Sequence, residues 1–353
     1  MPAGSVAADR IDSLLCNQSS SKVVVMRTSL CDLLGIDQPI VQAPIGSAAT
    51  PGLVAAVSEA GALGMLASTW PADPAAQVRE TRELTSRPFG VNLVLEWDQH
   101  ERLDELLEAG ARIVSLTWGS PDEYVERIHD AGGLVLHTVG SAEEARRAVG
   151  AGVDAVVAQG WEAGGHVWGG IATLPLVAAV VDAVDVPVVA AGGIGDGRGI
   201  AAVLALGASG AWLGTRFLLA EEAPVHDEYR QRLLAADERD AVWVPDLFDR
   251  GWEHAPHRVL RNSTVAAWEA AGRPGFGARA DEGEVVARSS DGREIVRYSS
   301  ALPLASYDGD IEALSLWAGQ SVGLVHDVAP AAEIVSRLVA ECDDALRRLA
   351  TLR

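Results

Sequence analysis

The sequence predicts an α/β protein whose main body is a (β/α)8 TIM barrel, followed by a smaller appended lobe and C-terminal helices. Three observations support this fold class. Eight short apolar runs alternate with amphipathic stretches, polar and glycine residues gather where each run ends, and 353 residues accommodate a barrel of about 250 residues plus an appendage. An open, doubly wound sheet is the competing arrangement, but it would concentrate ligand residues at one switch point.

The predicted strands are almost entirely apolar, as expected for parallel strands that helices cover on both sides. They span residues 39–43, 63–67, 90–95, 113–118, 134–139, 155–159, 186–191 and 211–214. The stretches between them carry helix start and stop signals. Ser141 provides a polar cap ahead of Glu143 and Glu144, and Gly150 and Gly152 end that helix. Eight βα units in succession favour a closed barrel.

The βα rhythm breaks after the eighth unit. The next segment is rich in Arg, Asp, Glu and Gly and in turn signals, and it predicts a smaller lobe or cap. Two amphipathic helices, at roughly 309–318 and 329–352, are expected to finish the chain. The predicted parts are a disordered extension, a barrel domain, the lobe, and C-terminal helices packing back on the barrel, at residues 1–25, 26–235, 236–308 and 309–353 respectively.

Composition narrows the class of protein. The formal net charge of −21 disfavours nucleic-acid and anionic-membrane partners, which both require a basic surface. No apolar run approaches the roughly 18 residues that a membrane span needs. The cysteines Cys16, Cys31 and Cys342 are widely scattered, which argues against disulfides and zinc and suits a reducing compartment. We expect a cytoplasmic enzyme or binding protein without a metal site.

Two glycine-bearing turns follow the seventh and eighth predicted strands. Gly192 and Gly193 lie in the first, and Gly214, Thr215 and Arg216 lie in the second. Loops at these two places of a barrel commonly form a phosphate site from backbone N–H groups. Thr215 adds a hydroxyl donor and Arg216 a charge. Each loop alone could simply be a tight corner, but the pair at the expected spacing predicts a phosphate-bearing ligand.

His166 follows the sixth predicted strand within a glycine-rich run. This composition predicts an imidazole outside any helix or strand core, mobile enough to reach a ligand and to exchange a proton near neutral pH. The alternative is an exposed loop histidine without a role. Other histidines stand in polar or irregular contexts and are expected to be surface or lobe residues: His100, His129, His226, His254, His257 and His326. The zinc-hydrolase and serine-hydrolase motifs HExxH, CxxC and GxSxG do not occur.

Half of the ten tryptophans stand at or just past the ends of predicted strands: Trp70, Trp97, Trp118, Trp161 and Trp168. They would gather around the mouth of the barrel. There they would either form rigid apolar walls of a pocket or seal neighbouring loops, and we expect some of each.

Several motifs, taken together and in this order, resemble the nitronate monooxygenases, formerly called 2-nitropropane dioxygenases. The motifs are Gln42-Ala43-Pro44-Ile45, Gly90-Val91-Asn92, Glu162-Ala163-Gly164-Gly165-His166, Ala191-Gly192-Gly193-Ile194, Leu213-Gly214-Thr215-Arg216-Phe217 and the closing motif Trp317-Ala318-Gly319-Gln320-Ser321-Val322-Gly323. The resemblance covers about residues 26–325. Flavin-dependent enoyl-ACP reductases and some NADH:quinone reductases are similar in the same motifs.

The resemblance implies a non-covalently bound FMN. Ala43, Pro44 and Ile45 would pass beneath the isoalloxazine ring, and Asn92 and Gln159 would hydrogen-bond its polar edge. The remaining implied cofactor contacts, around the phosphate, the ring and the closing motif, are Gly164, Gly165, Gly192, Gly193, Gly214, Thr215 and Gln320. His166 would face the reactive edge of the flavin as base or electrostatic anchor.

The activity that the resemblance implies is oxidation of alkyl nitronates, and sometimes neutral nitroalkanes, with dioxygen to a carbonyl compound and nitrite. A neutral His166 would remove a carbon-bound proton, whereas its imidazolium form would steady the charge of a nitronate. The implied partners are a small organic substrate and O2, and formation of a homo-oligomer is left open.

Three other functions compete with this one. An enoyl-thioester or quinone reductase would use the same scaffold with NAD(P)H, although an acidic carrier protein would be repelled by the charge of this chain. Relatives of inosine monophosphate dehydrogenase need a nucleophilic cysteine on a barrel loop, where this sequence has none. A flavin-binding sensor would keep the phosphate loops but would not need His166 at the mouth.

Overall fold

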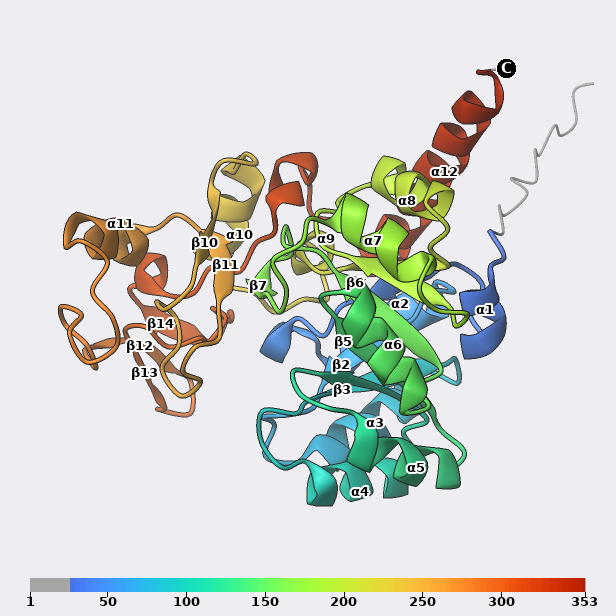
Figure 1. Ribbon diagram of the computed structural model, residues 1–353. Coiled ribbons are helices and arrows are strands. Elements are labelled where there is room, and N and C mark those ends of the chain that lie inside the picture. The colour runs from blue at the N-terminus through green and yellow to red at the C-terminus, as the bar shows by residue number, and fades with distance from the viewer. Residues whose placement is uncertain (1–25, 353) are drawn as a thin grey trace, which may run out of the picture.

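The computed structural model describes residues 26–352, so the expected extension at residues 1–25 lies outside the described residues. The eight predicted strands form one parallel sheet in the order β1-β9-β8-β6-β5-β4-β3-β2, and a bridge between Val41 and Leu63 closes β1 against β2. The strands are β1 Ile40–Gln42, β2 Gly64–Ala67, β3 Phe89–Val94, β4 Ile113–Thr117, β5 Leu134–Val139, β6 Ala155–Gln159, β8 Val188–Ala191 and β9 Gly210–Leu213. The (β/α)8 barrel is confirmed (Figure 1).

Helices cover the outside of the barrel between the strands. They are α2 Pro51–Glu59, α3 Pro74–Leu84, α4 His100–Glu108, α5 Asp122–Asp130, α6 Ala142–Gly150, α7 Thr173–Val181, α8 Gly197–Ala205 and the single turn α9 Thr215–Leu218. Capping side chains define several helix starts, because they accept hydrogen bonds from N–H groups that lack an intrahelical partner. Ser141 accepts such a bond from Glu144, and Asp196 accepts from Arg198 and Gly199.

A short helix, α1 Ser29–Leu34, closes the amino end of the barrel. Its buried side chains Leu30, Cys31 and Leu34 pack with inward-facing residues such as Met65 and Val189. The interior of the barrel is therefore a packed core and not a pore. The carboxyl ends of the strands are left as the place for a binding site.

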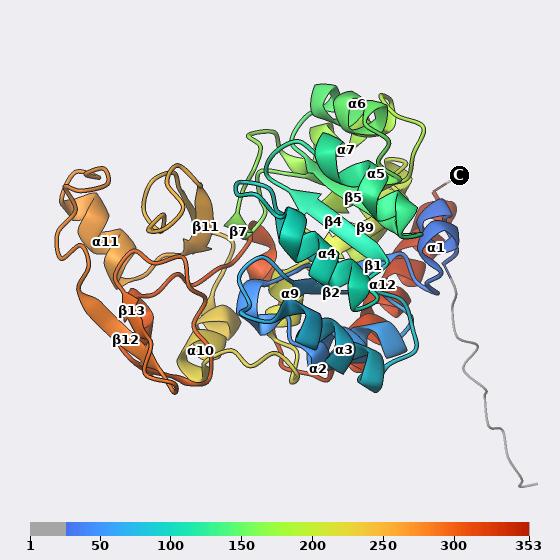
Figure 2. The ribbon, with the colours of Figure 1, turned by 90° about the horizontal axis from the view of Figure 1, so that it is seen from below.

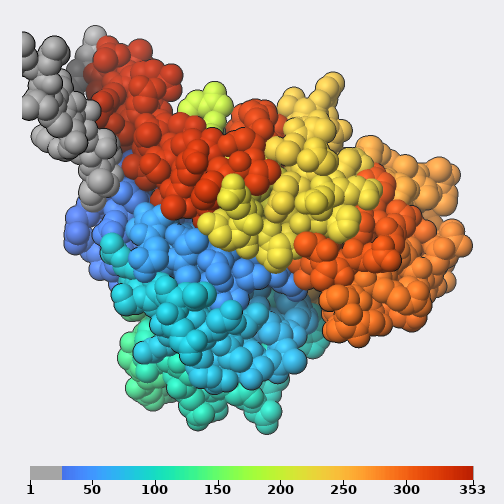
Figure 3. Space-filling model, turned by 180° about the vertical axis from the view of Figure 1, so that it is seen from behind, coloured from blue at the N-terminus to red at the C-terminus, as the bar shows by residue number. Residues whose placement is uncertain are grey.

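The last helix of the chain, α12 Ala331–Ala350, packs against α8 and α2. It therefore lies where the helix after the eighth strand belongs, between the seventh and first βα units. Its buried residues, including Ile334, Leu338 and Cys342, follow the helical spacing of an amphipathic face. Figure 3 shows the C-terminal segment, in red, lying over the blue N-terminal units of the barrel and beside the yellow start of the lobe.

The lobe lies to one side of the barrel (Figures 1 and 2). Its elements are α10 Asp227–Ala235, β10 Ala241–Val244, β11 His257–Leu260, α11 Ser263–Ala270, β12 Val285–Ser289, β13 Glu294–Val296 and β14 Tyr307–Gly309. β11 pairs antiparallel with β7 Gly165–His166, a two-residue strand in the loop after β6. This pairing connects the lobe to the barrel at the segment that carries the predicted catalytic histidine.

The helix predicted at 309–318 is wrong. Only one 3-10 turn forms there, at Ile311–Ala313, and the chain then runs extended beside β11. Leu260 donates its N–H to the carbonyl of Leu316 over 2.7 Å, and Trp317 forms a β-bridge with Val259. The apolar residues of this segment are buried on both of its sides, so their spacing resembles a helix face without producing one.

Candidate active site

A cavity of about 1120 Å³, mouth included, opens at the carboxyl end of the barrel strands. Trp252 of the lobe and Trp317 of the C-terminal segment complete its lining. Nearly all the residues singled out in the sequence lie around it: Ala43, Pro44, Ile45, Asn92, Gln159, Gly164, Gly165, His166, Gly192, Gly193, Gly214 and Thr215. The structure thus brings these side chains and turns, which come from five different βα units, together in one cavity.

Gln320 is the exception, since its neighbours Gly319 and Ser321 line the cavity instead. The Gln320 N–H donates to the carbonyl of Glu162 over 3.0 Å, which ties the closing motif to the loop after β6. A Cβ on Gly164 would collide with the backbone of Gly319. The closing motif is therefore a packing partner of the glycine-histidine loop, and the close approach explains the glycines in both.

The two predicted phosphate turns meet on one side of the cavity. Gly192 and Gly193 have φ angles of 95° and 71°, which glycine adopts without strain. Gly214 has φ −103°, and a Cβ there would meet Ile45 and Ala43 at ordinary distances of 3.5 and 3.7 Å. The protein itself therefore does not require glycine at position 214. A ligand that occupies the space beside this residue would require glycine there.

Arg216 does not face the cavity, contrary to the sequence-based expectation. Its guanidinium donates to the Asp327 carbonyl over 2.8 Å and to the Asp327 carboxylate over 3.1 Å, and burial lowers its pKa. The side chain thus links the end of the barrel to the segment before α12. Any phosphate here would have to rely on backbone N–H groups and the Thr215 hydroxyl, whose oxygen already accepts the Gly319 N–H over 2.9 Å.

The two amide side chains have different surroundings. The Asn92 amide nitrogen donates to the Ser115 carbonyl and the Thr117 hydroxyl over 3.1 and 3.0 Å, which leaves its oxygen for a ligand. Gln159 is used at both ends, because its nitrogen donates to the His166 carbonyl over 3.1 Å and its oxygen accepts the Trp168 N–H over 2.8 Å. Gln159 lines the cavity but holds the histidine segment in place on either side of Val167.

His166 is not in a free loop, which corrects the sequence-based expectation of mobility. It is the second residue of β7, and its register partner in β11 is His257. The imidazole centroid lies 3.7 Å from that of His257, 3.9 Å from the Trp252 ring, 5.6 Å from the Trp118 ring and 6.0 Å from the Trp317 ring. Pairing with a strand of the lobe, invisible to local sequence patterns, is what fixes this side chain.

Both histidines of this pair are uncharged near neutral pH. Burial, and in addition the proximity of His257, hold the pKa of His166 well below its ordinary value of 6.5. Burial lowers the pKa of His257 to about 3. His257 Nδ1 lies 2.9 Å from the Ala255 carbonyl, which can only accept, so Nδ1 carries the proton and Nε2 is an acceptor.

Four buried polar atoms around His166 have no hydrogen-bond partner in the described chain: His166 Nδ1, His257 Nε2, Trp252 Nε1 and Trp317 Nε1. Buried polar groups are normally paired, so each such atom requires an explanation. Three of them belong to residues that line the cavity, His166, Trp252 and Trp317, which is consistent with a bound molecule that supplies polar partners there.

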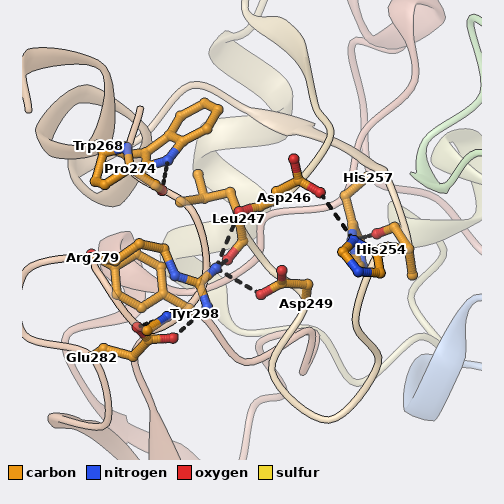
Figure 4. A network of polar contacts seen from close by, with 12 residues as sticks. Asp246, Leu247, Asp249, His254, His257, Trp268, Pro274, Arg279, Glu282 and Tyr298 are labelled. Atoms are coloured by element: carbon orange, nitrogen blue, oxygen red, sulfur yellow. Dashed lines mark hydrogen bonds and ion pairs between the residues drawn. The ribbon is translucent and has the colours of Figure 1, made fainter. Parts of the chain in front are cut away.

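His257 and Trp252 are functional candidates that sequence reasoning missed. Both belong to the lobe, and His257 was expected at the surface or within the lobe without a role; it is fully buried against His166. Figure 4 shows how the segment before them is anchored: Arg279 donates to the Leu247 carbonyl over 2.7 Å and to the Asp249 carboxylate over 2.6 Å. No sequence motif predicts this arrangement, because it depends on contacts between segments that are far apart in the sequence.

Unfolding should become easier as the solution is acidified, because His257 is held neutral in the folded protein. In the unfolded chain the His257 imidazole takes up a proton near pH 6.5, whereas in the folded chain it does so only near pH 3. The free energy of unfolding therefore decreases as the pH is lowered from about 6.5 towards 3. His137, with its pKa lowered by burial to about 4, contributes with the same sign. Each unit of difference corresponds to about 1.4 kcal/mol.

Urea denaturation at pH 7 and pH 5 measures this effect. The parent should lose more stability on acidification than His257→Gln, which lacks the titrating ring. An equal loss in both proteins would contradict the account of His257.

Among residues 26–352, no cluster of three or more His, Cys, Asp or Glu side chains is placed to hold a metal ion. Within the same residues, no helix has both the length and the apolar character that crossing a bilayer requires.

The chain matches the family model described as nitronate monooxygenase over residues 27–101 and 97–341. It is 35% identical to the (3aS,4S,5R,7aS)-5-hydroxy-7a-methyl-1-oxo-octahydro-1H-indene-4-carboxyl-CoA dehydrogenase of Rhodococcus jostii RHA1, across 93% of this chain and 98% of the relative.

Two solved structures extend the comparison. FabK from Thermotoga maritima is similar with a TM-score of 0.78 and 34% identity, across 92% of this chain and 99% of that one. Nitroalkane oxidase from Streptomyces ansochromogenes is similar with a TM-score of 0.72 and 31% identity, across 91% and 100%. The family model, the barrel and the full-length relatives agree. The chain belongs to the nitronate monooxygenase family of flavin-dependent oxidoreductases.

Proposed function

We propose that this enzyme binds FMN and oxidises nitroalkanes, together with their nitronates, with dioxygen to a carbonyl compound and nitrite. The observation that supports this most is the state of His166. It is a neutral imidazole, half-buried among aromatic rings, at a cavity that no Asp, Glu, Lys or Arg side chain of the described residues lines. A neutral base in an uncharged cavity suits a neutral carbon acid better than an anion.

The residues around the cavity fit FMN. The turns at Gly192, Gly193 and Gly214 line the cavity together with Thr215, and a Cβ on Gly214 would meet the chain only at ordinary distances, so the space beside that turn is free for a ligand. The Ala43-Pro44-Ile45 segment forms an apolar floor on which a flat ring would rest. When bound, the flavin would accept electrons from the substrate and deliver them to dioxygen.

His166 would take the proton from the carbon atom that bears the nitro group. The lowered pKa of His166 keeps the imidazole in the deprotonated form that can accept a proton. Negative charge then develops on the nitro oxygens. The indole N–H groups of Trp252 and Trp317, which have no hydrogen-bond partner in the described chain, would donate to that charge.

A second candidate function uses the same cofactor on a carbonyl substrate: dehydrogenation of an acyl thioester, or NAD(P)H-dependent reduction of a quinone or enoyl thioester. The similarity to a carboxyl-CoA dehydrogenase over 98% of that relative's length favours it. Here the same histidine would remove or return the proton beside the carbonyl group.

Two assays separate these functions. Nitrite release from nitroethane and from its nitronate, measured in air, should show turnover with the neutral compound as well as the anion. Mixing the enzyme with NADH without oxygen should leave the flavin oxidised. Rapid flavin bleaching by NADH without nitrite formation would overturn the proposal in favour of the reductase.

A further inference from the structure

His257 of the lobe and His166 of the barrel loop are held in contact by the strands that carry them. They are register partners in β11 and β7, so both side chains leave the pair of strands on the same face. Their ring centroids lie 3.7 Å apart, and the ring planes are tilted by 48°. Val167 donates its N–H to the Pro256 carbonyl over 3.0 Å, which fixes the backbone next to both histidines. Only rotation of the rings themselves remains free.

The Nε2 atom of His257 is a buried acceptor that a ligand in the cavity does not reach. The ring donates its Nδ1 proton to the Ala255 carbonyl over 2.9 Å, so Nε2 carries a lone pair. Burial lowers the pKa of His257 to about 3, so this lone pair stays unprotonated at neutral pH. Unlike His166, the fully buried His257 is not one of the described residues that line the cavity. Its acceptor therefore needs a donor from the protein itself, because buried polar atoms are normally paired.

His166 Nδ1 is the unpaired nitrogen best placed to donate to this acceptor. Within residues 26–352 it is buried without a hydrogen-bond partner, and the indole N–H of Trp317 is in the same state. The Trp317 centroid lies 6.1 Å from that of His257, compared with 3.7 Å for His166, and a ligand in the cavity can serve Trp317. The structure shows the two imidazoles in contact without a hydrogen bond between them. A turn of the His166 ring about its Cβ–Cγ bond, a torsion with broad preferences, is the motion that pairs both nitrogens at once.

We infer that His257 is a positioning residue, whose Nε2 accepts a hydrogen bond from the Nδ1–H group of His166. This bond holds the His166 proton on Nδ1, because an imidazole whose Nδ1 donates keeps its other nitrogen as an acceptor. Nδ1 is buried, so Nε2 is the His166 nitrogen left to meet a ligand in the cavity. The use of Nε2 as a base rests on the proposed function, whereas the tautomer follows from the histidine pair alone.

The hydrogen bond to His257 becomes stronger as the substrate loses its proton. The C–H bond of the substrate breaks and an N–H bond forms at His166 Nε2, while the electron pair of the broken bond stays with the substrate. The His166 ring then carries a positive charge, so its Nδ1–H group donates a charge-assisted bond to His257. His257 keeps its own proton on Nδ1 and remains neutral. An interaction that strengthens during proton transfer lowers the barrier to that transfer.

The tautomer of His166 tests the inference without any turnover. In protein labelled with ¹⁵N at histidine, protonated and unprotonated ring nitrogens resonate separately, and the His166 signals are those that vanish in His166→Gln. We expect the proton on Nδ1 in the parent at pH 7. His257→Leu removes the acceptor, so the His166 signals should shift toward those of a tautomer mixture. A parent with the proton on His166 Nε2, or a tautomer that His257→Leu leaves unchanged, would overturn the inference. If His257→Leu does not fold, the parent spectrum alone decides.

Nitroethane kinetics provide the second readout. His257→Leu should lower kcat by about tenfold to a hundredfold and change KM by less than about twofold, as expected for a group that orients a catalytic imidazole. His257→Gln places an amide oxygen at about the reach of Nε2 and should restore most of kcat.

The matched control is His100→Leu, which removes an imidazole stacked on Tyr124 outside the cavity lining. It should change neither the kinetics nor the His166 tautomer. Equal losses of kcat in His257→Leu and His257→Gln, or an effect on KM alone, would contradict the positioning role. A parent protein that releases no nitrite would refute the proposed function, while the tautomer measurement would still decide this inference.

Discussion

Replacing His166 by alanine is expected to lower turnover of nitroalkanes by about 10² to 10⁴, the usual contribution of a general base. FMN should remain bound, because the glycine turns and the Ala43–Ile45 floor that would hold it do not depend on the imidazole. Turnover of a preformed nitronate should fall less, since its proton is already absent. Nitrite release and the flavin absorbance of the purified variant measure the two properties separately.

His254→Ala is the matched control. That side chain belongs to the same segment of the lobe as Trp252 and is 87% exposed. Its removal should change neither quantity. If His166→Ala oxidised nitroalkanes at the parental rate, the histidine would have no part in the reaction, and the proposed proton transfer would be wrong.

Replacing Gly214 by valine is expected to weaken FMN binding at least about a hundredfold. The added side chain would occupy space that the ligand needs, so the FMN phosphate would lose most of its contacts with the protein. Folding should be little affected. The backbone at position 214 has an ordinary negative φ angle, and a Cβ there meets only Ile45 and Ala43 at van der Waals distance. Flavin content after purification and titration of the apoprotein with FMN measure the loss.

Gly150→Val serves as the control, since a Cβ at that position in α6 has nothing within 4 Å and lies outside the cavity lining. It should purify with full flavin. Undiminished FMN binding by Gly214→Val would place the phosphate elsewhere and would remove the basis for the two-turn cradle.

Local patterns were sufficient to predict the barrel. Each strand is a buried apolar run ended by glycine or polar residues, and those ends meet at one face because the strands are parallel. The same rule placed Asn92, His166 and the glycine turns around one cavity. Gln320 does not line the cavity, whereas its neighbours Gly319 and Ser321 do.

The surroundings of the reacting group could not be predicted. His257 and Trp252 reach His166 only because β11 pairs with β7, and that pairing joins segments far apart in the chain. The segment after β14 is buried on both of its sides, so the spacing of its apolar residues resembles that of an amphipathic helix and led to the wrong prediction. Sequence periodicity reports which residues are buried, but it does not report which element buries them.

Analysis of the chromophore released from the purified protein tests the central claim most directly. The account predicts a yellow protein that yields FMN by mass spectrometry, one per chain, and that regains its absorbance when the apoprotein is mixed with FMN. A colourless protein that cannot be reconstituted with FMN would contradict it.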